Sequence, residues 1–479
     1  MPISSTPLFI SAAHKSSGKT TITIGLLAAL KNKGLSVQPF KKGPDYIDPL
    51  WHGSASGTPC YTLDFNTMSR DEILQLVSRK TATCDISIIE GNKGLYDGLD
   101  LDGSNSNAAI AKLVDAPVIL VLDARGMTRG VAPLILGYQS FDPGIQIAGI
   151  ILNQLGGSRH EAKLRSVIEH YTDVPVLGAV HKDKRLEIVE RHLGLMPSNE
   201  DGEAQQKITA IGSIISSQVD LNKIIDISQV HSPKHLKSPI KNTPGTQPVT
   251  AEIRLAYIND GAFGFYYPGD LEALEQAGAE LIEVNSLTDR QLPENIDGLF
   301  IGGGFPEERL KELNANQSFR ESVFNAIENG LPAYAECGGL MYLCRSILSN
   351  QEHGEQQQLD MVGIIPADAK MEETPQGRGL IRFSETSLMP WPDASGIHKS
   401  DHKNEVIISA HEFHYSHLIN ISEPLSYAYE IHRGSGIDGQ HDGIIYKNLL
   451  ACYAHLQDTR QNHWAKRFIQ FIHHKKRRN

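Results

Sequence analysis

Short apolar runs alternate along the chain with longer stretches whose apolar residues recur at helical spacing. In the first half the runs cover residues 8–10, 37–40, 84–89, 117–123, 147–153 and 175–180. In the second half they cover residues 253–258, 280–284, 298–301, 332–335 and 449–453. A repeated succession of strand and helix is typical of a parallel, doubly wound sheet. We therefore predict an α/β fold in each half of the chain.

The two halves are separated by a change in composition. Residues 230–250 are rich in Ser, Pro, Lys and Thr and poor in apolar residues, as in a linker. A chain of 479 residues is also too long for a single hydrophobic core. The predicted organisation is a first domain over residues 1–228, a linker over 229–250, a second domain over 251–465 and a basic, solvated tail over 466–479.

Composition and charge narrow the class of protein. The net charge of −11 disfavours a general nucleic-acid-binding role. The five cysteines form neither a CxxC pair nor a disulfide framework, which suits a reducing compartment. The first residues lack the pattern of a secretory leader, and no run approaches the length of about 18 apolar residues that spans a membrane. We expect a cytoplasmic protein with no membrane or nucleic-acid partner.

The first chemical motif lies between the strand at residues 8–10 and a helical run at 22–30. Gly18, Lys19, Thr20 and Thr21 stand at this loop–helix junction. Backbone N–H groups at a helix N-terminus cradle phosphate, a lysine supplies positive charge to the outer phosphates, and a threonine hydroxyl reaches Mg²⁺. The first glycine of the usual phosphate-binding loop is replaced by Ala13. The pattern predicts an ATP site with Mg²⁺.

Acidic residues follow the predicted strands of the same domain. Asp45 and Asp48 lie between two prolines, Glu90 ends a buried strand, and Asp97 lies in a glycine-spaced loop. A carboxylate at a strand end beside a phosphate-binding loop is the usual second anchor for Mg²⁺. Any one of these acids could instead cap a turn. The grouping favours function, and we predict a metal site formed by Thr20, Asp45 and Glu90.

A second centre of chemistry surrounds Cys337. This residue stands between Glu336 and two glycines, immediately after the apolar run at 332–335, in the pattern of a sharp strand-to-helix turn. A buried structural cysteine is the alternative interpretation. A nucleophilic cysteine needs a base and donors for the oxyanion that forms. The predicted donors are the backbone N–H groups of Gly303 or Gly304 and of Gly338. The candidate bases are His411, His414 and His455, and spacing alone does not choose among them.

Taken together, these motifs resemble cobyrinic acid a,c-diamide synthases. The residues that carry the resemblance are 18–20 (GKT), 42–49 (KGPDYIDP), 90–91 (EG), 336–342 (ECGGLMY), 411–416 (HEFHYS) and 453–455 (YAH). The resemblance runs in order from about residue 7 to residue 457. It implies an ATP-binding domain akin to dethiobiotin synthetase, followed by a class I glutamine amidotransferase-like domain.

The resemblance also implies roles for residues. Cys337 is then the nucleophile and His455 the residue that activates it. Ordinary class I amidotransferases carry an acid two residues after this histidine, whereas this chain has Gln457. The cobyrinate branch works without that acid, so another group must orient His455. In the first domain, Asp48 and Asp97 are expected to bind or orient the acceptor or the incoming ammonia.

The implied reaction is the ATP- and glutamine-dependent amidation of the a and c acetates of a tetrapyrrole. ATP phosphorylates each carboxylate, and ammonia released from glutamine displaces the phosphate. The partners are then glutamine and a tetrapyrrole dicarboxylate, and a homodimer is compatible with the sequence.

Three alternatives remain open at this point. Asn92 and Lys93 replace an apolar pair of the corrinoid enzymes, and with residues 99–107 they look more like the branch that amidates sirohaem or sirohydrochlorin. A P-loop switch ATPase of the partitioning kind would need no Cys–His half, and its signature lysine is replaced here by His14. A cobyric acid synthase is disfavoured by residues 42–49, and Cys337 excludes a plain dethiobiotin synthetase-like carboxylase.

Overall fold

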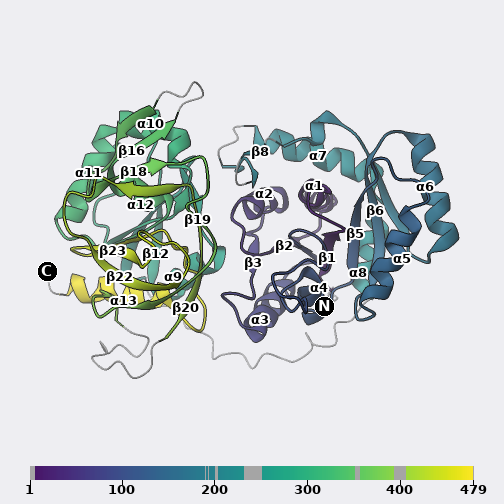
Figure 1. Cartoon of the computed structure of the whole chain (residues 1–479), viewed down its shortest axis with the longest axis horizontal. Helices are drawn as coiled ribbons and strands as arrows, with labels where there is room; N and C mark the ends of the chain where they lie inside the picture. Colours follow the sequence, from purple (N-terminus) through teal and green to yellow (C-terminus); the bar gives the residue numbers. More distant parts are fainter. Residues whose placement is uncertain are drawn as a thin grey trace. The chain divides into compact units, whose positions relative to one another are not determined.

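The computed structural model describes residues 6–188, 190–191, 194–199, 203–230, 251–350, 356–392 and 406–477. It contains two compact units, Met1–Thr243 and Pro244–Asn479 (Figure 1). Most of the predicted linker, residues 231–250, lies outside the described residues. The predicted boundaries of the linker therefore stay a prediction.

The first unit is built on a sheet of seven parallel strands in the order β3-β2-β4-β1-β5-β6-β7. The central strands β1 and β4 are buried along their whole length, as expected of a sheet that is covered on both faces. The strands are β1 (Leu8–Ala12), β2 (Val37–Lys42), β3 (Tyr61–Leu63), β4 (Ile86–Glu90), β5 (Val118–Asp123), β6 (Ile147–Leu155) and β7 (Val176–His181), with a small hairpin of β8 (Glu190–Arg191) and β9 (Gly194–Leu195).

Helices cover both faces of this sheet (Figure 1). α1 (Lys19–Asn32) packs against α2 (Ile47–Ser56) and α7 (Ala204–Gln218). Residues of α3, α4, α5 and α6 share a separate hydrophobic core with the strands. These and the remaining helices are α3 (Arg70–Thr81), α4 (Asn107–Leu113), α5 (Val131–Phe141), α6 (Ser158–Tyr171), η1 (Lys184–Leu186) and α8 (Leu221–Val230). The predicted doubly wound parallel sheet is confirmed.

The second unit is built on a nine-stranded sheet in the order β12-β10-β13-β15-β24-β23-β22-β19-β20. Its first five strands are parallel, and the others join antiparallel. In chain order they are β10 (Ile253–Ile258), β12 (Ala279–Val284), β13 (Gly298–Ile301), β15 (Ala333–Glu336), β19 (Gly377–Glu385), β20 (Ile408–His414), β22 (Ser426–Arg433), β23 (His441–Tyr446) and β24 (Leu449–Cys452). The parallel part follows the predicted apolar runs, and the antiparallel part was not predicted.

Smaller sheets and helices complete this unit. β11 (Phe263–Phe265) pairs with β14 (Gly303–Gly304), and a four-stranded sheet has the order β17-β16-β18-β21. The strands of the latter are β16 (Cys344–Asn350), β17 (Gln356–Asp360), β18 (Ile365–Met371) and β21 (Ser416–Ile419). The helices are α9 (Pro268–Gln276), η2 (Pro306–Arg309), α10 (Leu310–Ala315), α11 (Gln317–Glu328), α12 (Gly338–Leu343) and α13 (Trp464–Lys476).

The predicted basic tail over residues 466–479 is wrong for most of its length. Helix α13 occupies Trp464–Lys476, and it buries Phe468, Ile469 and Ile472 in the core of the second unit. Four of its basic residues lie in the last turn, where positive charge complements the helix dipole: His473, His474, Lys475 and Lys476. The apolar face therefore outweighs the charge, and the segment belongs to the second unit. No helix among the described residues is long and apolar enough to cross a membrane.

Candidate active sites

The loop between β1 and α1 forms the first candidate site. Gly18 precedes the helix with φ +84°, a left-handed conformation that favours glycine. A Cβ at this position would lie 2.2 Å from Nδ2 of Asn153, which donates a hydrogen bond of 2.9 Å to the Ser17 carbonyl. Asn153, at the end region of β6, therefore fixes the backbone of the loop.

Lys19 and Thr20 are the first residues of α1, and Thr21 follows them half-buried. The Lys19 side chain is almost fully buried. Burial lowers the pKa of Lys19, and the negative charge of Glu90 partly opposes this effect. A lysine held in this position can give positive charge to a bound phosphate.

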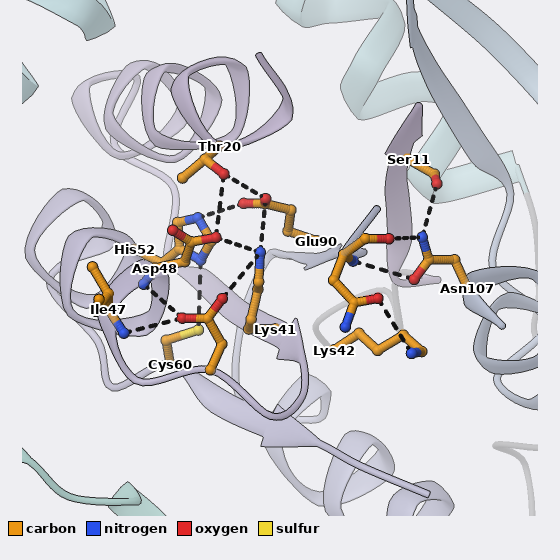
Figure 2. Close-up of polar contacts among 12 residues, drawn as sticks. Ser11, Thr20, Lys41, Lys42, Ile47, Asp48, His52, Cys60, Glu90 and Asn107 are labelled. Atoms are coloured by element: carbon orange, nitrogen blue, oxygen red, sulfur yellow. Dashed lines mark hydrogen bonds and ion pairs between the residues drawn. The ribbon is translucent and has the colours of Figure 1, made fainter. Parts of the chain in front are cut away.

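A compact group of charged side chains lies next to this helix start. Figure 2 shows the Lys41 ammonium between the carboxylates of Asp48 and Glu90. The ammonium lies 2.5 Å from Asp48 Oδ2 and 2.9 Å from Glu90 Oε1. The Thr20 hydroxyl donates to the same oxygens, at 2.8 Å to Glu90 and 3.2 Å to Asp48. Lys41 and Glu90 face each other in register on β2 and β4. We call Thr20, Lys41, Asp48 and Glu90 the Lys41 cluster.

Asp45 joins this cluster differently from the prediction. Its Oδ1 accepts hydrogen bonds of 3.0 Å from the backbone N–H groups of Ile47 and Asp48, at the start of α2. Its Oδ2 lies 3.7 Å from the Lys41 ammonium. Burial and the neighbouring Asp48 charge raise the pKa of Asp45 to about 7. The structure thus brings Asp48, rather than Asp45, into contact with Thr20, and the metal-binding role of Asp45 stays a prediction.

Lys41 and His52 both contact Glu90, and sequence reasoning missed both of them. His52 Nε2 lies 2.7 Å from Glu90 Oε2, and His52 Nδ1 lies 3.8 Å from the Cys60 sulfur. Burial would raise the pKa of Glu90, but Lys41 and His52 outweigh it and hold that pKa well below its usual range. The available signal was spacing, because Asp48 and His52 are four residues apart on α2 and share a face.

The loop after Glu90 is anchored by Asn107 (Figure 2). Asn107 Nδ2 donates to the Ser11 hydroxyl at 3.3 Å and to the carbonyls of Asn92 and Gly94, and its Oδ1 accepts from the Asn92 N–H at 3.2 Å. Asp97 accepts a hydrogen bond of 2.8 Å from the Gly94 N–H. Asp97 therefore braces its own loop, and among the described residues it forms no hydrogen bond or ion pair with the Lys41 cluster.

The donor set of the Lys41 cluster fits Mg²⁺. Its oxygen atoms are the hydroxyl of Thr20 and the carboxylate oxygens of Asp48 and Glu90, and Mg²⁺ prefers such hard oxygen donors. Within the described residues, no three His, Cys, Asp or Glu side chains are arranged to hold a metal by themselves. A Mg²⁺ ion usually uses only one or two carboxylates, with waters and substrate phosphates as its other ligands. The set is therefore suitable for a nucleotide-bound ion.

Cys337 forms the second candidate site, in the other unit. It stands between β15 and α12 with φ +47°, a strained conformation for a residue other than glycine. Its backbone N–H donates to the Cys452 carbonyl at 2.7 Å, and its thiol donates to the Phe413 carbonyl at 3.6 Å. Burial, with the nearby charge of Glu307, raises the pKa of the Cys337 thiol well above its usual range. A nucleophilic role for this thiol would therefore require a base.

Among the three candidate histidines, His455 has its ring against Gly303, one of the predicted oxyanion donors. It follows β24, and its backbone exchanges two hydrogen bonds with His411, of 2.7 and 3.3 Å. A Cβ on Gly303 would lie 2.5 Å from Cε1 of the His455 ring. The ring of His414 is engaged elsewhere, since Nδ1 lies 2.7 Å from the Ser416 carbonyl and the ring stacks on Tyr453 at 3.8 Å.

The predicted oxyanion donors meet beside Cys337. A Cβ on Gly338 would lie 2.9 Å from the carbonyl oxygen of Gly304 and 3.0 Å from its nitrogen, so the two loops can approach only because Gly338 has no side chain. Gly303 and Gly304 form β14, which pairs with β11. The structure thus brings Gly303, Gly304, Gly338 and His455 together around the cysteine turn, while their catalytic roles stay predictions.

Comparison with known proteins identifies both units. Residues 9–195 match the model of the CobQ/CobB/MinD/ParA nucleotide binding domain. Residues 254–462 match the model of the CobB/CobQ-like glutamine amidotransferase domain. The first match includes the Lys41 cluster, and the second includes Cys337 and His455.

Full-length relatives agree with this pairing of domains. A cobyrinate a,c-diamide synthase of Magnetococcus marinus is 41% identical over 98% of this chain and 98% of its own. The enzyme of the same name from Methanosarcina acetivorans is 39% identical over 97% of this chain and 94% of its own. That from Archaeoglobus fulgidus is 37% identical over 98% of both chains.

The nucleotide-binding and amidotransferase domains make this chain a carbon–nitrogen ligase that binds ATP and takes its amido nitrogen from glutamine. With such identity over nearly the whole length, the chain belongs to the family of cobyrinate a,c-diamide synthases.

Proposed function

We propose that this protein amidates the a and c acetate carboxylates of cobyrinate. The observation that supports this most strongly is the full-length similarity to enzymes of that name, in a chain that keeps both a phosphate-binding loop beside charged oxygens and a cysteine turn beside a histidine. Each amidation consumes one ATP and one glutamine. The products are the amide, ADP, phosphate and glutamate.

In the first unit, the acceptor carboxylate oxygen attacks the γ-phosphorus of ATP and ADP leaves. The backbone of the loop before α1 holds the phosphates, and Lys19 neutralises charge on them. Thr20, Asp48 and Glu90 would hold Mg²⁺, and Asp45 would fix the start of the helix that carries Asp48. This proposal exchanges the predicted roles of the two acids, since the sequence suggested Asp45 for the metal and Asp48 for the acceptor or the ammonia. When bound, Mg²⁺ neutralises charge that develops on the transferred phosphoryl group. Ammonia then attacks the acyl carbon of the acyl phosphate, and phosphate leaves.

In the second unit, His455 takes the thiol proton of Cys337 and the thiolate attacks the side-chain amide of glutamine. The backbone N–H groups of Gly338 and of Gly303 or Gly304 stabilise the oxyanion. His455 gives its proton to the departing ammonia, and water then hydrolyses the thioester to glutamate. Burial of Cys337 explains why the base is needed, since the neutral thiol is a weak nucleophile.

The loop after Glu90 is proposed to face the acceptor. Leu99 and Leu101 are exposed there, and Asn105 holds the loop by accepting the Leu99 N–H at 2.7 Å and donating to Asp100 at 2.7 Å. Asp97 lies at the base of this loop, and we retain its proposed role toward acceptor or ammonia. The sirohaem alternative, which the departure at Asn92 and Lys93 suggested, is not favoured by the relatives.

The test offers several acceptors to the purified protein. Cobyrinate, hydrogenobyrinate, sirohydrochlorin and sirohaem are each incubated with ATP, Mg²⁺ and glutamine, and amide number is read by mass spectrometry. We expect two amides on cobyrinate. If sirohaem or sirohydrochlorin is amidated and cobyrinate is not, the proposal that cobyrinate is the acceptor is wrong. The control is Cys337→Ser, which should form no product with glutamine as the nitrogen donor if Cys337 is needed to release the ammonia.

A further inference from the structure

The carboxylate that orients the histidine in ordinary class I amidotransferases has no counterpart at position 457 of this chain, which is Gln457. The structure places another carboxylate against the same ring. Glu336, the residue immediately before the nucleophile, has Oε2 at 3.4 Å from Nδ1 of His455. Both side chains are buried, with 3% and 2% of their surface exposed. A buried pair of this kind interacts with little screening by solvent.

Glu336 is itself fixed on its other oxygen. The Tyr334 hydroxyl donates a hydrogen bond of 2.6 Å to Oε1, and the backbone N–H of Leu456 donates one of 2.9 Å to the same atom. The Leu456 bond comes from the residue next to His455. The carboxylate is therefore tied to the backbone that carries the histidine, and its Oε2 is left directed to the ring.

We propose that Glu336 is the positioning residue of the amidotransferase site, in the role that a carboxylate two residues after the histidine fills in ordinary class I enzymes. Glu336 holds the Nδ1–H tautomer of His455, which leaves Nε2 to accept the thiol proton of Cys337. It then stabilises the imidazolium that forms until the proton passes to the departing ammonia. The group acts through His455 and does not touch glutamine.

The main alternative is a purely structural role, in which Glu336 only accepts the hydrogen bonds of Tyr334 and Leu456. Glu336→Gln separates the two roles. The glutamine carbonyl oxygen can still accept both of these hydrogen bonds, but the neutral amide supports an imidazolium poorly. A structural role thus predicts a small effect, and a positioning role predicts a loss in the chemical step.

The experiment measures glutamine hydrolysis by the full-length protein, with ammonia release as the readout. For Glu336→Gln we expect kcat to fall about 10²-fold or more, as is typical when acid–base support is removed. KM for glutamine and the unfolding temperature should stay unchanged. In the double variant Glu336→Gln/Gln457→Glu, which places an acid at the ordinary class I position, we expect kcat to recover in part.

Glu328→Gln is the matched control. Glu328 also accepts a tyrosine hydroxyl, that of Tyr446 at 2.5 Å, but it pairs with Lys447 and not with a histidine. The kcat of Glu328→Gln should match that of the unmodified protein. The proposal is overturned if the kcat of Glu336→Gln stays within about threefold of the unmodified protein, because so small a change does not require the loss of acid–base support. It is also overturned if kcat, KM and the unfolding temperature all deteriorate together without recovery in the double variant.

Discussion

Lys41 shows how a single buried charge can organise a site. Its ammonium is almost inaccessible to solvent and lies near the carboxylates of Asp45, Asp48 and Glu90. Burial alone would lower the pKa of Lys41, but Asp48 and Glu90 outweigh it and raise that pKa well above its usual value. The lysine therefore remains charged, and its positive charge offsets the repulsion among the neighbouring acids.

We predict that Lys41→Met destabilises the first unit by about 3–5 kcal/mol, because it leaves buried carboxylates without their cation. The measurement is chemical unfolding monitored in the first unit, without nucleotide. Lys42→Met is the matched control, since the Lys42 ammonium donates to the Asn92 side chain at 3.3 Å rather than lying among the acids of the cluster. Equal losses in the two variants would contradict the organising role of Lys41.

Asp45 provides a prediction about pH. Its pKa of about 7 in the folded protein lies above the ordinary value near 3.9, so the folded state binds the proton more tightly than the unfolded state. The stabilisation from this proton is complete below pH about 3.9 and is lost as the pH rises through about 7. Asp45→Asn keeps an oxygen that can accept from the N–H groups of Ile47 and Asp48, and it has no proton to lose. As the pH rises from 5 to 8, its stability should therefore increase relative to that of the unmodified protein.

The expected relative gain is on the order of 2 kcal/mol, measured by unfolding at both pH values without nucleotide or Mg²⁺. Asp85→Asn serves as the control. The Asp85 carboxylate is exposed and bonded to Ser36, which lowers its pKa, so it is ionised in both states throughout this pH range. A stability difference for Asp45→Asn that does not vary with pH would contradict the raised pKa.

Among the elements, helix α13 is the clearest difference between prediction and structure. The basic residues at the end of the chain suggested a solvated tail, yet Trp464, Phe468 and Ile472 recur at helical spacing and are buried. Arg467 reinforces the helix through two hydrogen bonds with the Glu385 carboxylate, of 2.6 and 2.9 Å. Net charge obscured an amphipathic pattern that was present in the sequence.

We predict that Phe468→Ala destabilises the second unit by about 3–5 kcal/mol, the usual cost of emptying a buried aromatic position. Lys466→Ala, on the exposed face of the same helix, should change stability by less than about 0.5 kcal/mol. Thermal unfolding of the two variants measures the contrast. A Phe468→Ala protein as stable as Lys466→Ala would mean that the helix is dispensable to the core.

The elements that the apolar runs predicted were mainly the central parallel strands. Strands β1, β4 and β13 are buried along their whole length, so their sequences are mostly apolar and easy to recognise. The antiparallel strands β19 and β22 mix buried, half-buried and exposed positions without a regular period, and they carry charged residues. Their pairing joins segments far apart in sequence, which local patterns do not encode.

The candidate sites could be predicted only in part, because some of their contacts join residues that are far apart in the sequence. Gly18, Lys19 and Cys337 belong to contiguous motifs whose chemistry is local to one turn. Glu336 supports His455 through a contact that spans 119 residues, and Lys41 meets Glu90 only because β2 and β4 pair in register. Such partners follow from strand order, which the sequence pattern left undetermined.

Across the whole molecule, the two units divide one reaction. In the proposed function, the glutamine amidotransferase unit releases ammonia at Cys337, and the nucleotide-binding unit activates a carboxylate with ATP. Ammonia that became ammonium in bulk water would lose its nucleophilic lone pair, so the two half-reactions are useful only when coupled. In this proposal glutamine supplies the nitrogen through the reaction at Cys337, and the first unit selects the acceptor.

Transfer of the glutamine amide nitrogen to cobyrinate can be followed with glutamine carrying ¹⁵N in its side-chain amide. The protein is incubated with this glutamine, ATP, Mg²⁺, unlabelled ammonium and cobyrinate, and the product is analysed by mass spectrometry. We predict a diamide in which both new amides carry ¹⁵N, and Cys337→Ala should give only unlabelled amide. Consumption of ATP and glutamine without labelled amide on cobyrinate would contradict the proposed function.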